Sequence, residues 1–348
     1  EDAVYVTAAN IARSGTVSDL ESSWRGLKLL VDQLPAAGEV LVEVVDIEPG
    51  AVGELLRGRA SEAPFDLPDA IFVVPRVQTL QALFEIADLG EQLYVPCVVG
   101  IEPELVGVSQ KWAVEEGGRH PAAGEWKALR KSDALGWLCL TANPIAVFVE
   151  GAGEARRTVF ASPVWSLAAA MTASFREVGT FSRILGGNSK LRAPATWIIP
   201  DEPGKGLAAP TRAFCSIRAQ TQLAALGVTG IGSARNSDSL MLSAVPTAYK
   251  GEGPNPLPLP AQILTGRVVR FSLWVASQLS ARSSDEEIAQ CYAEASRAFL
   301  FPGMDRAARL AARAVRQEAK SAVAVEAKAS AGYAGAPFEI EFEIPLTD

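Results

Sequence analysis

The spacing of apolar residues in the first third of the chain alternates between strand and helix periods. The runs AIFVVP (70–75) and YVPCVVGI (94–101) are continuous and apolar, as in buried strands, and EVLVEVVDI (39–47) also predicts a strand. Residues 51–59 and 77–93, which lie between these runs, have helical spacing. This strand–helix–strand order predicts βαβ units and a partly parallel sheet.

The middle of the chain continues the mixed pattern after a polar interruption at 115–125, which we interpret as a loop. Two strands, GWLCLTA and IAVFVEG, are predicted on either side of a turn at Asn143. A long helix follows them, with Ser162 as its cap and Pro163 at its first position. The pattern therefore predicts that strands and helices stay interleaved rather than separating into blocks.

In the second half of the chain, the pattern predicts fewer strands and more helices. A strand is predicted at 195–200, and a helix ends at Gly227 before another strand. The Pro-rich stretch 251–260 is interpreted as an extended linker. Two helices, 261–282 and 284–301, follow it.

The C-terminal region carries two regular patterns. Cations recur at intervals of 3, 4, 3 and 4 residues, which predicts a helix over 305–320 with all five on one face. These cations are Arg306, Arg309, Arg313, Arg316 and Lys320. Strands are predicted at 322–328 and 338–344, and the second alternates glutamates with apolar residues. Its apolar face consists of Phe338, Ile340, Phe342 and Ile344.

The stretch LESSWRGLKLLVDQL (20–34) has the spacing of an amphipathic helix but contains a glycine. The positions that predict its buried face are Leu20, Trp24, Leu27, Leu30 and Val31. Gly26 lies in the middle of this helix, where glycine costs roughly 1 kcal/mol relative to alanine. It therefore indicates either the close approach of a neighbouring backbone or a fixed family motif.

Composition narrows the class of protein. Of the 348 residues, 49% are hydrophobic and 21% charged, and the mean hydropathy is +0.16, which favours a surface covered by other subunits. The net charge is −8, and residues 37–107 hold thirteen Asp and Glu against three Lys and Arg, which argues against a general nucleic-acid binder. No uncharged run reaches the roughly 20 residues of a spanning helix. The cysteines, Cys97, Cys139, Cys215 and Cys291, form no CxxC pair, so we expect free thiols.

The sequence offers few residues for catalysis. Its single histidine, His120, lies in a Gly/Pro stretch, so a three-histidine metal site is impossible. No GxxxxGK[ST] phosphate loop occurs, and Gly230-x-Gly232 lacks the third glycine of a dinucleotide fingerprint. The acidic residues after Ser284 fit the first turn of a capped helix rather than a metal site. We therefore expect no catalytic residue, no metal and no cofactor.

The helix motif carries a resemblance to a known family. The segment LESSWRGLKLLVD, with Trp24, Arg25 and Gly26, is similar to the nearly fixed E-x-x-W-R-G-L segment of the large sheath subunit of the bacterial type VI secretion system, the TssC/VipB family. Later segments resemble that family in the same order along the chain: LFEIADLGEQLYVPCVVGIEPELVG, EWKALRKSDALGWLCL, FASPVWSLAAAMTASFREVGTFSRILG, CSIRAQTQLAALGVTGIGSARNSDSLMLSAV, ILTGRVVRFSLWVASQL and AVAVEAKASAGYAGAPFEIEFEI.

Two features depart from the family pattern. The segment LTANPIAVFVEG lacks the arginines of the corresponding family strand. The family's region upstream of W-R-G-L, which carries an inter-subunit arm and a helix gripped by an AAA+ unfoldase, is mostly absent. Because residue 1 is Glu rather than Met, we expect either a divergent, trimmed sheath protein or a native segment that precedes residue 1.

The resemblance implies a mixed α/β fold with a phage-tail-sheath-like core and C-terminal strands available for an inter-subunit sheet. We expect three regions: 1–160 with the βαβ units, 161–302 as the central core, and 303–348 with the basic helix and the inter-subunit strands. The implied protein is a non-enzymatic, cytoplasmic subunit of a contractile sheath that polymerises around an inner tube and drives its ejection. Implied partners are copies of itself, a small TssB/VipA-like subunit, an Hcp-like tube, a baseplate and an AAA+ unfoldase, with no nucleic acid and no membrane insertion.

The resemblance also suggests roles for the C-terminal residues. We expect the cation helix to face an acidic tube surface, and the strand of Phe338 to pair within its own subunit or a neighbour's. Two other classes stay open. One is a Rossmann-like nucleotide-binding enzyme, suggested by the βαβ units with Gly230 and Gly232. The other is a baseplate or shell protein that reuses the sheath fold.

Overall fold

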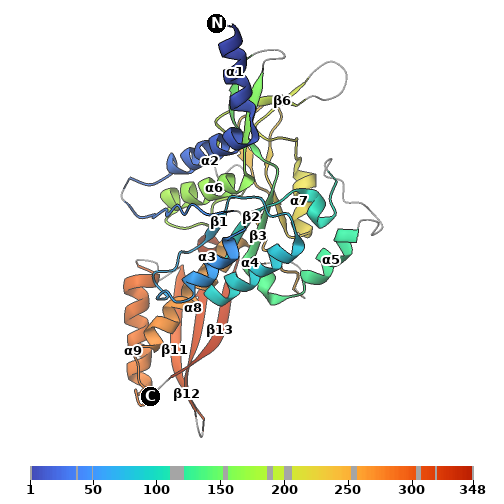
Figure 1. The fold of residues 1–348 in the computed structure, drawn as a ribbon. Coiled ribbons are helices and arrows are strands. Elements are labelled where there is room, and N and C mark those ends of the chain that lie inside the picture. The colour runs from blue at the N-terminus through green and yellow to red at the C-terminus, as the bar shows by residue number, and fades with distance from the viewer. Residues whose placement is uncertain are drawn as a thin grey trace.

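A computed structural model gives an elongated molecule with two N-terminal helices at one end, a parallel sheet in the middle and an antiparallel sheet at the other end (Figure 1). The structure describes residues 2–36, 38–48, 50–109, 121–151, 156–185, 191–199, 206–251, 257–302, 307–317 and 320–346. The mixed α/β fold class predicted from the sequence is confirmed.

The central sheet contains four parallel strands in the order β1-β2-β3-β8. They are β1 (Ile71–Val73), β2 (Cys97–Gly100), β3 (Leu138–Ala142) and β8 (Val228–Gly230). Nearly every residue of these strands is buried, because helices cover both faces of the sheet. The continuous apolar runs at 70–75 and 94–101 are thereby explained.

Alternate residues of the central strands enter two hydrophobic clusters on opposite faces. On one face, Cys97 and Val99 pack with α3 (Val52–Arg59) and α4 (Leu80–Leu93). On the other face, Val98 packs with α6 (Pro163–Val178). Both α3 and α4 were predicted. Helix α6 begins at the predicted Pro163 and ends at Val178, because the next residue, Gly179, has a left-handed φ of 69°.

Smaller elements surround this sheet. The turn at Asn143 is confirmed, with φ 81°, but it connects β3 to a strand of a different sheet. The two-stranded sheets are β4 (Ile145–Glu150) with β5 (Arg157–Ala161), β6 (Trp197–Ile199) with β7 (Leu207–Ala209), and β9 (Gly232–Ser233) with β10 (Leu240–Met241). The remaining helices here are η1 (Pro103–Val106), α5 (Pro121–Leu129), η2 (Asp133–Trp137) and α7 (Ile217–Ala225).

One buried cation connects segments of the central body. Arg130, just after α5, donates from Nε to the carbonyl of Ala248 (2.8 Å) and from Nη1 to the carbonyl of Ala225 (2.7 Å). Burial lowers the pKa of Arg130 to about 10. Both hydrogen bonds of the Arg130 side chain are accepted by backbone carbonyl oxygens, and no carboxylate among the described residues forms an ion pair with it.

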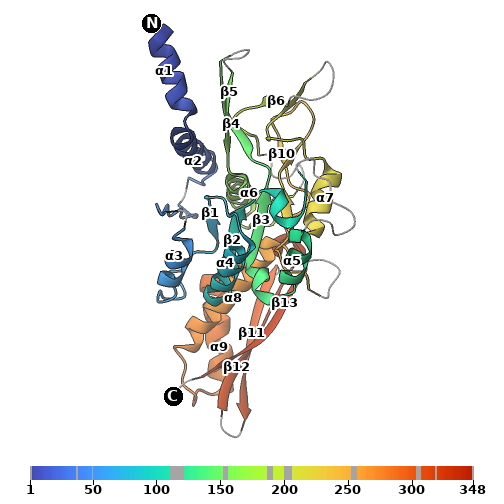
Figure 2. The ribbon, with the colours of Figure 1, turned by 45° about the vertical axis from the view of Figure 1, so that its right-hand side comes forward.

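The N-terminal helices α1 (Asp2–Arg13) and α2 (Gly15–Val31) lie at the far end from the C-terminal sheet. Figure 2 shows α1 extending away from the body, while α2 lies beside α6. The side chain of Arg157 reaches α1, where its Nη1 donates to the carbonyl of Ala12 (3.0 Å).

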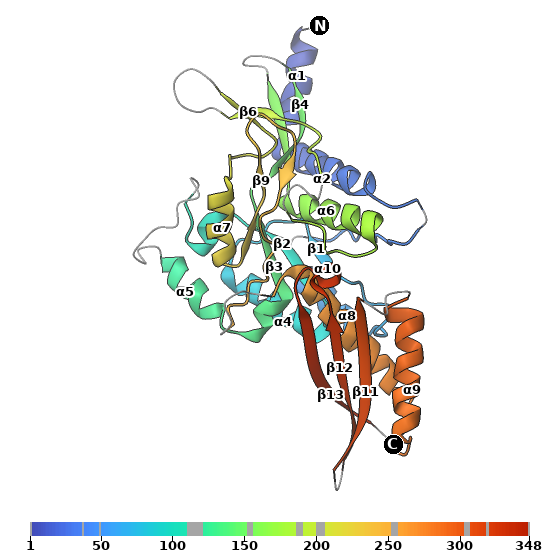
Figure 3. The same ribbon diagram turned by 180° about the vertical axis from the view of Figure 1, so that it is seen from behind.

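The C-terminal unit is an antiparallel sheet in the order β11-β12-β13, packed on α8 and α9 (Figure 3). Its elements are α8 (Leu259–Ala276), α9 (Asp285–Ala295), a π-helical turn (Ser296–Leu300), β11 (Ala308–Gln317), β12 (Lys320–Ala329), α10 (Ala331–Ala334) and β13 (Phe338–Pro345). The cap predicted at Ser284 is present, since Ser284 and Glu287 form a reciprocal capping box.

The predicted helix over 305–320 is wrong, because residues 308–317 form strand β11. The segment is rich in alanine and arginine, which favour helices. Its alternate residues, however, complete an apolar face: Leu310 is 9% exposed and lies opposite Ala327, which lies opposite Ile340. Tertiary packing against β12 thus outweighs local propensity.

Two other predictions of local structure are also corrected. Residues 39–47 form no strand, because no described strand pairs with them. Leu41 is 93% exposed, whereas Val42 and Ile47 each pack against a hydrophobic cluster of the central body. The loop expected at 115–125 is helical from Pro121 onward, and 115–120 with His120 lie outside the described residues. The linker expected at 251–260 gives way to α8 at Leu259, and 252–256 lie outside the described residues.

Candidate assembly interface

Gly26 is required because α2 packs closely on α6. A Cβ built on Gly26 would lie 2.6 Å from Cγ of Trp165, a residue of α6 that is 8% exposed. The glycine therefore allows the indole to lie directly against the helix backbone. This answers the question that the sequence left open: the close neighbour is a side chain rather than a backbone.

Arg25 belongs to a charged cluster that fixes α2 to the hairpin of β4 and β5. Its guanidinium carbon lies 3.6 Å from the ring centroid of Phe148, and its Nε donates to Glu21 (2.8 Å). Arg157 donates from Nη1 to Glu21 (2.7 Å) and from Nε to Glu150 (2.5 Å). Burial alone would raise the pKa of Glu21, but the hydrogen bonds from Arg157 and Arg25 lower it.

Trp24 points away from the body, contrary to the prediction of a buried apolar face. It is 64% exposed, and Leu20 and Val31 are 59% and 48% exposed. The buried side of α2 consists instead of Gly26, Leu29 and Leu30, with Leu27 partly buried against the same core. The prediction is correct for Leu30 but wrong for Trp24, Leu20 and Val31, because apolar residues occupy both sides of the helix. Arg25 and Gly26 thus attach α2 to the rest of the chain, whereas Trp24 contributes exposed apolar surface.

The C-terminal sheet is amphipathic, with one apolar face on α8 and α9 and one charged face in solvent. The apolar side of β13 matches the sequence prediction: Phe338 and Ile344 are buried, and Ile340 and Phe342 are partly buried in the same cluster. In this chain β13 pairs with its own β12. Both β11 and β13 are edge strands of the three-stranded sheet.

The five predicted cations do not share one face. Arg309 and Arg313 point to the solvent side of β11, opposite Lys328 and Ala324 of β12. Arg316 lies on the other side, where its Nη2 donates to Asp285 in the first turn of α9 (3.2 Å). Arg306 lies outside the described residues, as does the side chain of Lys320, which begins β12.

Positive and negative side chains are unevenly distributed on the charged face of the sheet. From β11 to β13, Arg309 lies opposite Lys328 and then Glu339, and Ala311 lies opposite Glu326 and then Glu341. Arg313 reaches across Ala324 to pair with Glu341 at 3.1 Å. Lys328 pairs with Glu326 (2.5 Å) and Glu339 (2.7 Å). The β11 side therefore carries cations and the β13 side carries carboxylates.

The space beside the two glycines that suggested a nucleotide site is occupied by neighbouring atoms of the chain. A Cβ on Gly230 would lie 2.7 Å from Leu223, and one on Gly232 would lie 2.5 Å from the carbonyl oxygen of Cys215. At the carboxyl ends of β1 and β2, the carboxylate of Glu102 is shared by Arg76 and Arg212 (3.3 Å to Arg212). The described strand order also lacks the reversal at which such sheets bind nucleotides.

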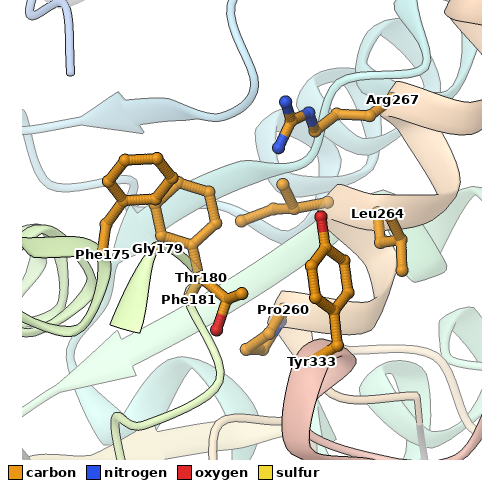
Figure 4. Close-up of a pocket in the computed structure, with 9 residues that line it drawn as sticks. Phe175, Gly179, Thr180, Phe181, Pro260, Leu264, Arg267 and Tyr333 are labelled. Atoms are coloured by element: carbon orange, nitrogen blue, oxygen red, sulfur yellow. The ribbon is translucent and has the colours of Figure 1, made fainter. Parts of the chain in front are cut away.

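The pocket in Figure 4 lies between the end of α6, α8 and α10. Phe175, Phe181, Leu264, Arg267 and Tyr333 are among the residues that line it. Its volume is about 20 Å³, the space of roughly one water molecule, so it does not admit an organic substrate.

The remaining candidate features are metal-binding side chains, cysteines and membrane-spanning helices. Among the described residues no three His, Cys, Asp or Glu side chains gather as a metal site would require. All four cysteines are free thiols, as the sequence predicts; Cys97, Cys139 and Cys215 are buried, and Cys291 is partly exposed. None of the described helices has the length and apolarity needed to cross a membrane.

Comparison with known proteins yields likeness to solved structures but no match to a family model or a curated protein. No family model matches the sequence, and no curated protein matches it. Among solved structures, the chain is similar to the helical sheath of the anti-feeding prophage (AFP) in its contracted state, determined by cryo-EM. The match has 9% sequence identity and a TM-score of 0.42, and it covers 80% of this chain and 67% of that one. Likeness at this score decides neither family nor function.

Proposed function

We propose that this protein is a non-enzymatic structural subunit of a contractile sheath, which polymerises around an inner tube and drives its ejection on contraction. The observation that carries the proposal is the C-terminal sheet, whose two outer strands, β11 and β13, are both edges. Edge strands present unpaired backbone groups that another chain can extend. A sheet that is open on both sides suits a polymer, because each subunit can contact two neighbours.

A second surface supports a role in assembly. Trp24, Leu20 and Val31 expose apolar side chains on α2, and Val4 and Ile11 on α1 are 72% and 58% exposed. Exposed apolar side chains of this density mark protein contacts in soluble proteins. Copies of the same chain are the first expected partners.

The finer assignment follows the sequence resemblance. The ordered motifs beginning with Trp24, Arg25 and Gly26 favour a type VI secretion-like sheath of the TssC/VipB kind. Its further partners would be a small TssB/VipA-like subunit, an Hcp-like tube, a baseplate and an AAA+ unfoldase, in the cytoplasm. Because Arg309, Arg313 and Arg316 do not form one helical face, we propose no tube-binding face for them.

A nucleotide-binding enzyme is the main alternative, favoured by the parallel sheet β1-β2-β3-β8. Against it, neighbouring residues occupy the space beside Gly230 and Gly232 in which a Cβ would lie. A baseplate or shell protein with the same fold is the other alternative.

Electron microscopy separates these functions. The chain is co-expressed with its genomic neighbours, purified and examined by negative stain. Tubes or cogwheel-shaped cross-sections are expected for a sheath. A monodisperse particle that binds a nucleotide saturably would support the enzyme and overturn the proposal. Closed shells or a single plate would support the structural alternative.

A further inference from the structure

The C-terminal unit has a hydrophobic core of its own. Every buried residue of this core lies between Ala261 and Ile344. Among the described residues beyond 257, the two clusters of the central body include as buried members only Leu259 and Ile263, in the first two turns of α8. The described parts of the two bodies therefore share a hydrophobic core only at the start of this helix.

The contacts around the start of α8 fit a pivot. Ser182 of the central body donates from Oγ to the carbonyl of Gly332 in α10 (2.7 Å), and the small pocket of Figure 4, lined by Pro260 among others, lies in the same region. Farther along α8, Gly266 lies against the carbonyl oxygen of Tyr94, where glycine offers no side chain to interlock. Contacts close to an axis move little when a body turns about that axis.

Residues 65–69, which precede β1 and which we call the strap, bind α8 beyond this pivot. Arg270 of α8 is 5% exposed, and its Nη1 donates to the carbonyl of Leu67 (2.6 Å). Its Nη2 donates to the carboxylate of Asp69 (3.2 Å). The Nε of Arg267 lies 3.4 Å from the same carboxylate. The strap therefore attaches α8 to the central body by charge and by a backbone hydrogen bond.

Phe65 extends this contact toward the end of α8. Its ring meets the indole of Trp274 edge-on, with 4.9 Å between the ring centroids. Arg267, Arg270 and Trp274 are separated by three and four residues, so they lie on one face of the helix. The strap thus follows one face of α8 for about two helical turns.

The attachment of the strap depends on one carboxylate. Among the described residues, Arg267 and Arg270 form ion pairs with Asp69 and with no other acidic side chain. A buried guanidinium that loses its carboxylate partner keeps an uncompensated charge, which is strongly unfavourable. The side chain of Asp69 is 44% exposed, so water reaches the pair. Separating the strap from α8 brings all three charges into water, whereas opening either hydrophobic core exposes apolar surface.

We propose that the C-terminal unit turns as one body about the start of α8, and that the carboxylate of Asp69 holds it in the observed orientation. This inference concerns the single chain and does not rest on the proposed function. Helix α8 has 18 residues and is about 27 Å long, so a turn of roughly 10° at its start moves its far end by about 5 Å. The turn changes the orientation of the C-terminal sheet relative to α2, with its exposed Trp24, while each hydrophobic core stays closed.

A distance measurement between the two bodies tests this inference. Nitroxide spin labels are attached through Ala289→Cys on α9 and Gln222→Cys on α7, both exposed sites, in a chain that also carries Cys291→Ser; the other three cysteines are buried. Pulsed electron spin resonance should give one narrow distance in this labelled chain. Adding Asp69→Asn should produce a second distance, with the turned population raised roughly tenfold or more. Adding Phe65→Ala as well should raise it further, and Asp69→Glu should restore the single distance.

Asp238→Asn is the matched control. It removes a carboxylate of similar exposure, 42%, from a 3.4 Å pair with Arg192 inside the central body, and it should leave the distance unchanged. Arg267→Gln keeps the pair of Asp69 with Arg270 and should show the second distance at a lower level, so it decides the case if Asp69→Asn does not fold by circular dichroism. An unchanged single distance in the folded variants would overturn the inference. The measurement uses unassembled chains, so this failure would leave the proposed function intact.

Discussion

The indole of Trp165 fills the space that a side chain on Gly26 would need, with its Cγ 2.6 Å from the position of a Cβ. Two helices far apart in sequence, α2 and α6, are thereby held at a separation that only glycine permits. Gly26 thus serves packing. It lowers the helix propensity of α2, but it allows the ring of Trp165 to be buried.

Gly26→Ala should therefore destabilise the protein despite the better helix propensity of alanine. Overpacking costs about 1–3 kcal/mol, and propensity returns about 1 kcal/mol, so we expect a net loss of up to about 2 kcal/mol. Denaturant unfolding measures it. Gly15→Ala, at a position with no neighbour within 4 Å of a Cβ, is the control and should not destabilise. A Gly26→Ala variant more stable than the wild type would contradict the packing described here.

The two tryptophans of this region should respond oppositely to truncation. Trp165→Ala removes a buried ring and should cost about 3–5 kcal/mol in the free energy of unfolding. Trp24→Ala changes an exposed residue and should alter stability by less than about 0.5 kcal/mol. We expect Trp24→Ala to weaken assembly instead, as measured by sedimentation. Normal assembly of that variant would remove Trp24 from the proposed contacts.

Acid should weaken the attachment of α2 through Glu21. Because its pKa is lowered in the folded chain, the ionised carboxylate contributes stability above its ordinary pKa of 4.5, and this contribution disappears as pH falls through the folded pKa. Glu21→Gln should cost about 1 kcal/mol at neutral pH. The difference from the wild type should shrink in unfolding experiments below pH 4.5. Asp32→Asn removes an exposed ion pair with Lys28 and should have little effect at any pH.

The buried thiols predict a loss of stability in alkali. Burial raises the pKa of Cys97, Cys139 and Cys215 from 9.0 to about 12. Between these values the unfolded chain releases protons that the folded chain retains, so stability should fall as pH rises above 9. A thiol reagent at pH 8 should modify Cys291 first in the native protein. Rapid modification of all four thiols without unfolding would contradict the burial.

Truncating β13 is expected to damage folding as well as assembly, because its apolar side chains belong to the core of the C-terminal unit. Ile344 is 5% exposed, so Ile344→Ala should cost about 2–5 kcal/mol, measured by denaturant unfolding at low protein concentration. Glu343→Ala on the solvent side should change stability by less than about 0.5 kcal/mol. Equal effects of the two substitutions would mean that β13 does not fold on its own chain.

The sequence predicted the elements whose packing agrees with their local pattern. Strand β2 is a continuous apolar run, and helix α4 and strand β13 each have one clear periodicity; all three were correctly assigned. Strand β11 was missed because its residues favour helices and only the pairing with β12 makes it a strand.

The candidate interface was less predictable for a similar reason. Leu20 and Trp24 have the same spacing as core residues, and only the position of α6 decides which side of α2 is buried. The contact of Arg25 with Phe148 joins residues from separate elements and has no sequence pattern. The sign difference between the two sheet edges follows from the register of three strands, which no single strand reveals.

The two ends of the pH scale act on different parts of this molecule. Arg130 binds carbonyl oxygens, which have no proton to gain in acid, so the junction of α5, α7 and the segment of Ala248 is indifferent to low pH. The attachment of α2 depends on a carboxylate, Glu21, that acid neutralises. Acidification should thus release the N-terminal helices while the centre stays closed, whereas alkali destabilises the centre, because the buried thiols of Cys97 and Cys139 lose their protons more readily in the unfolded chain. Partial unfolding of this chain has a direction, and the choice of pH selects it.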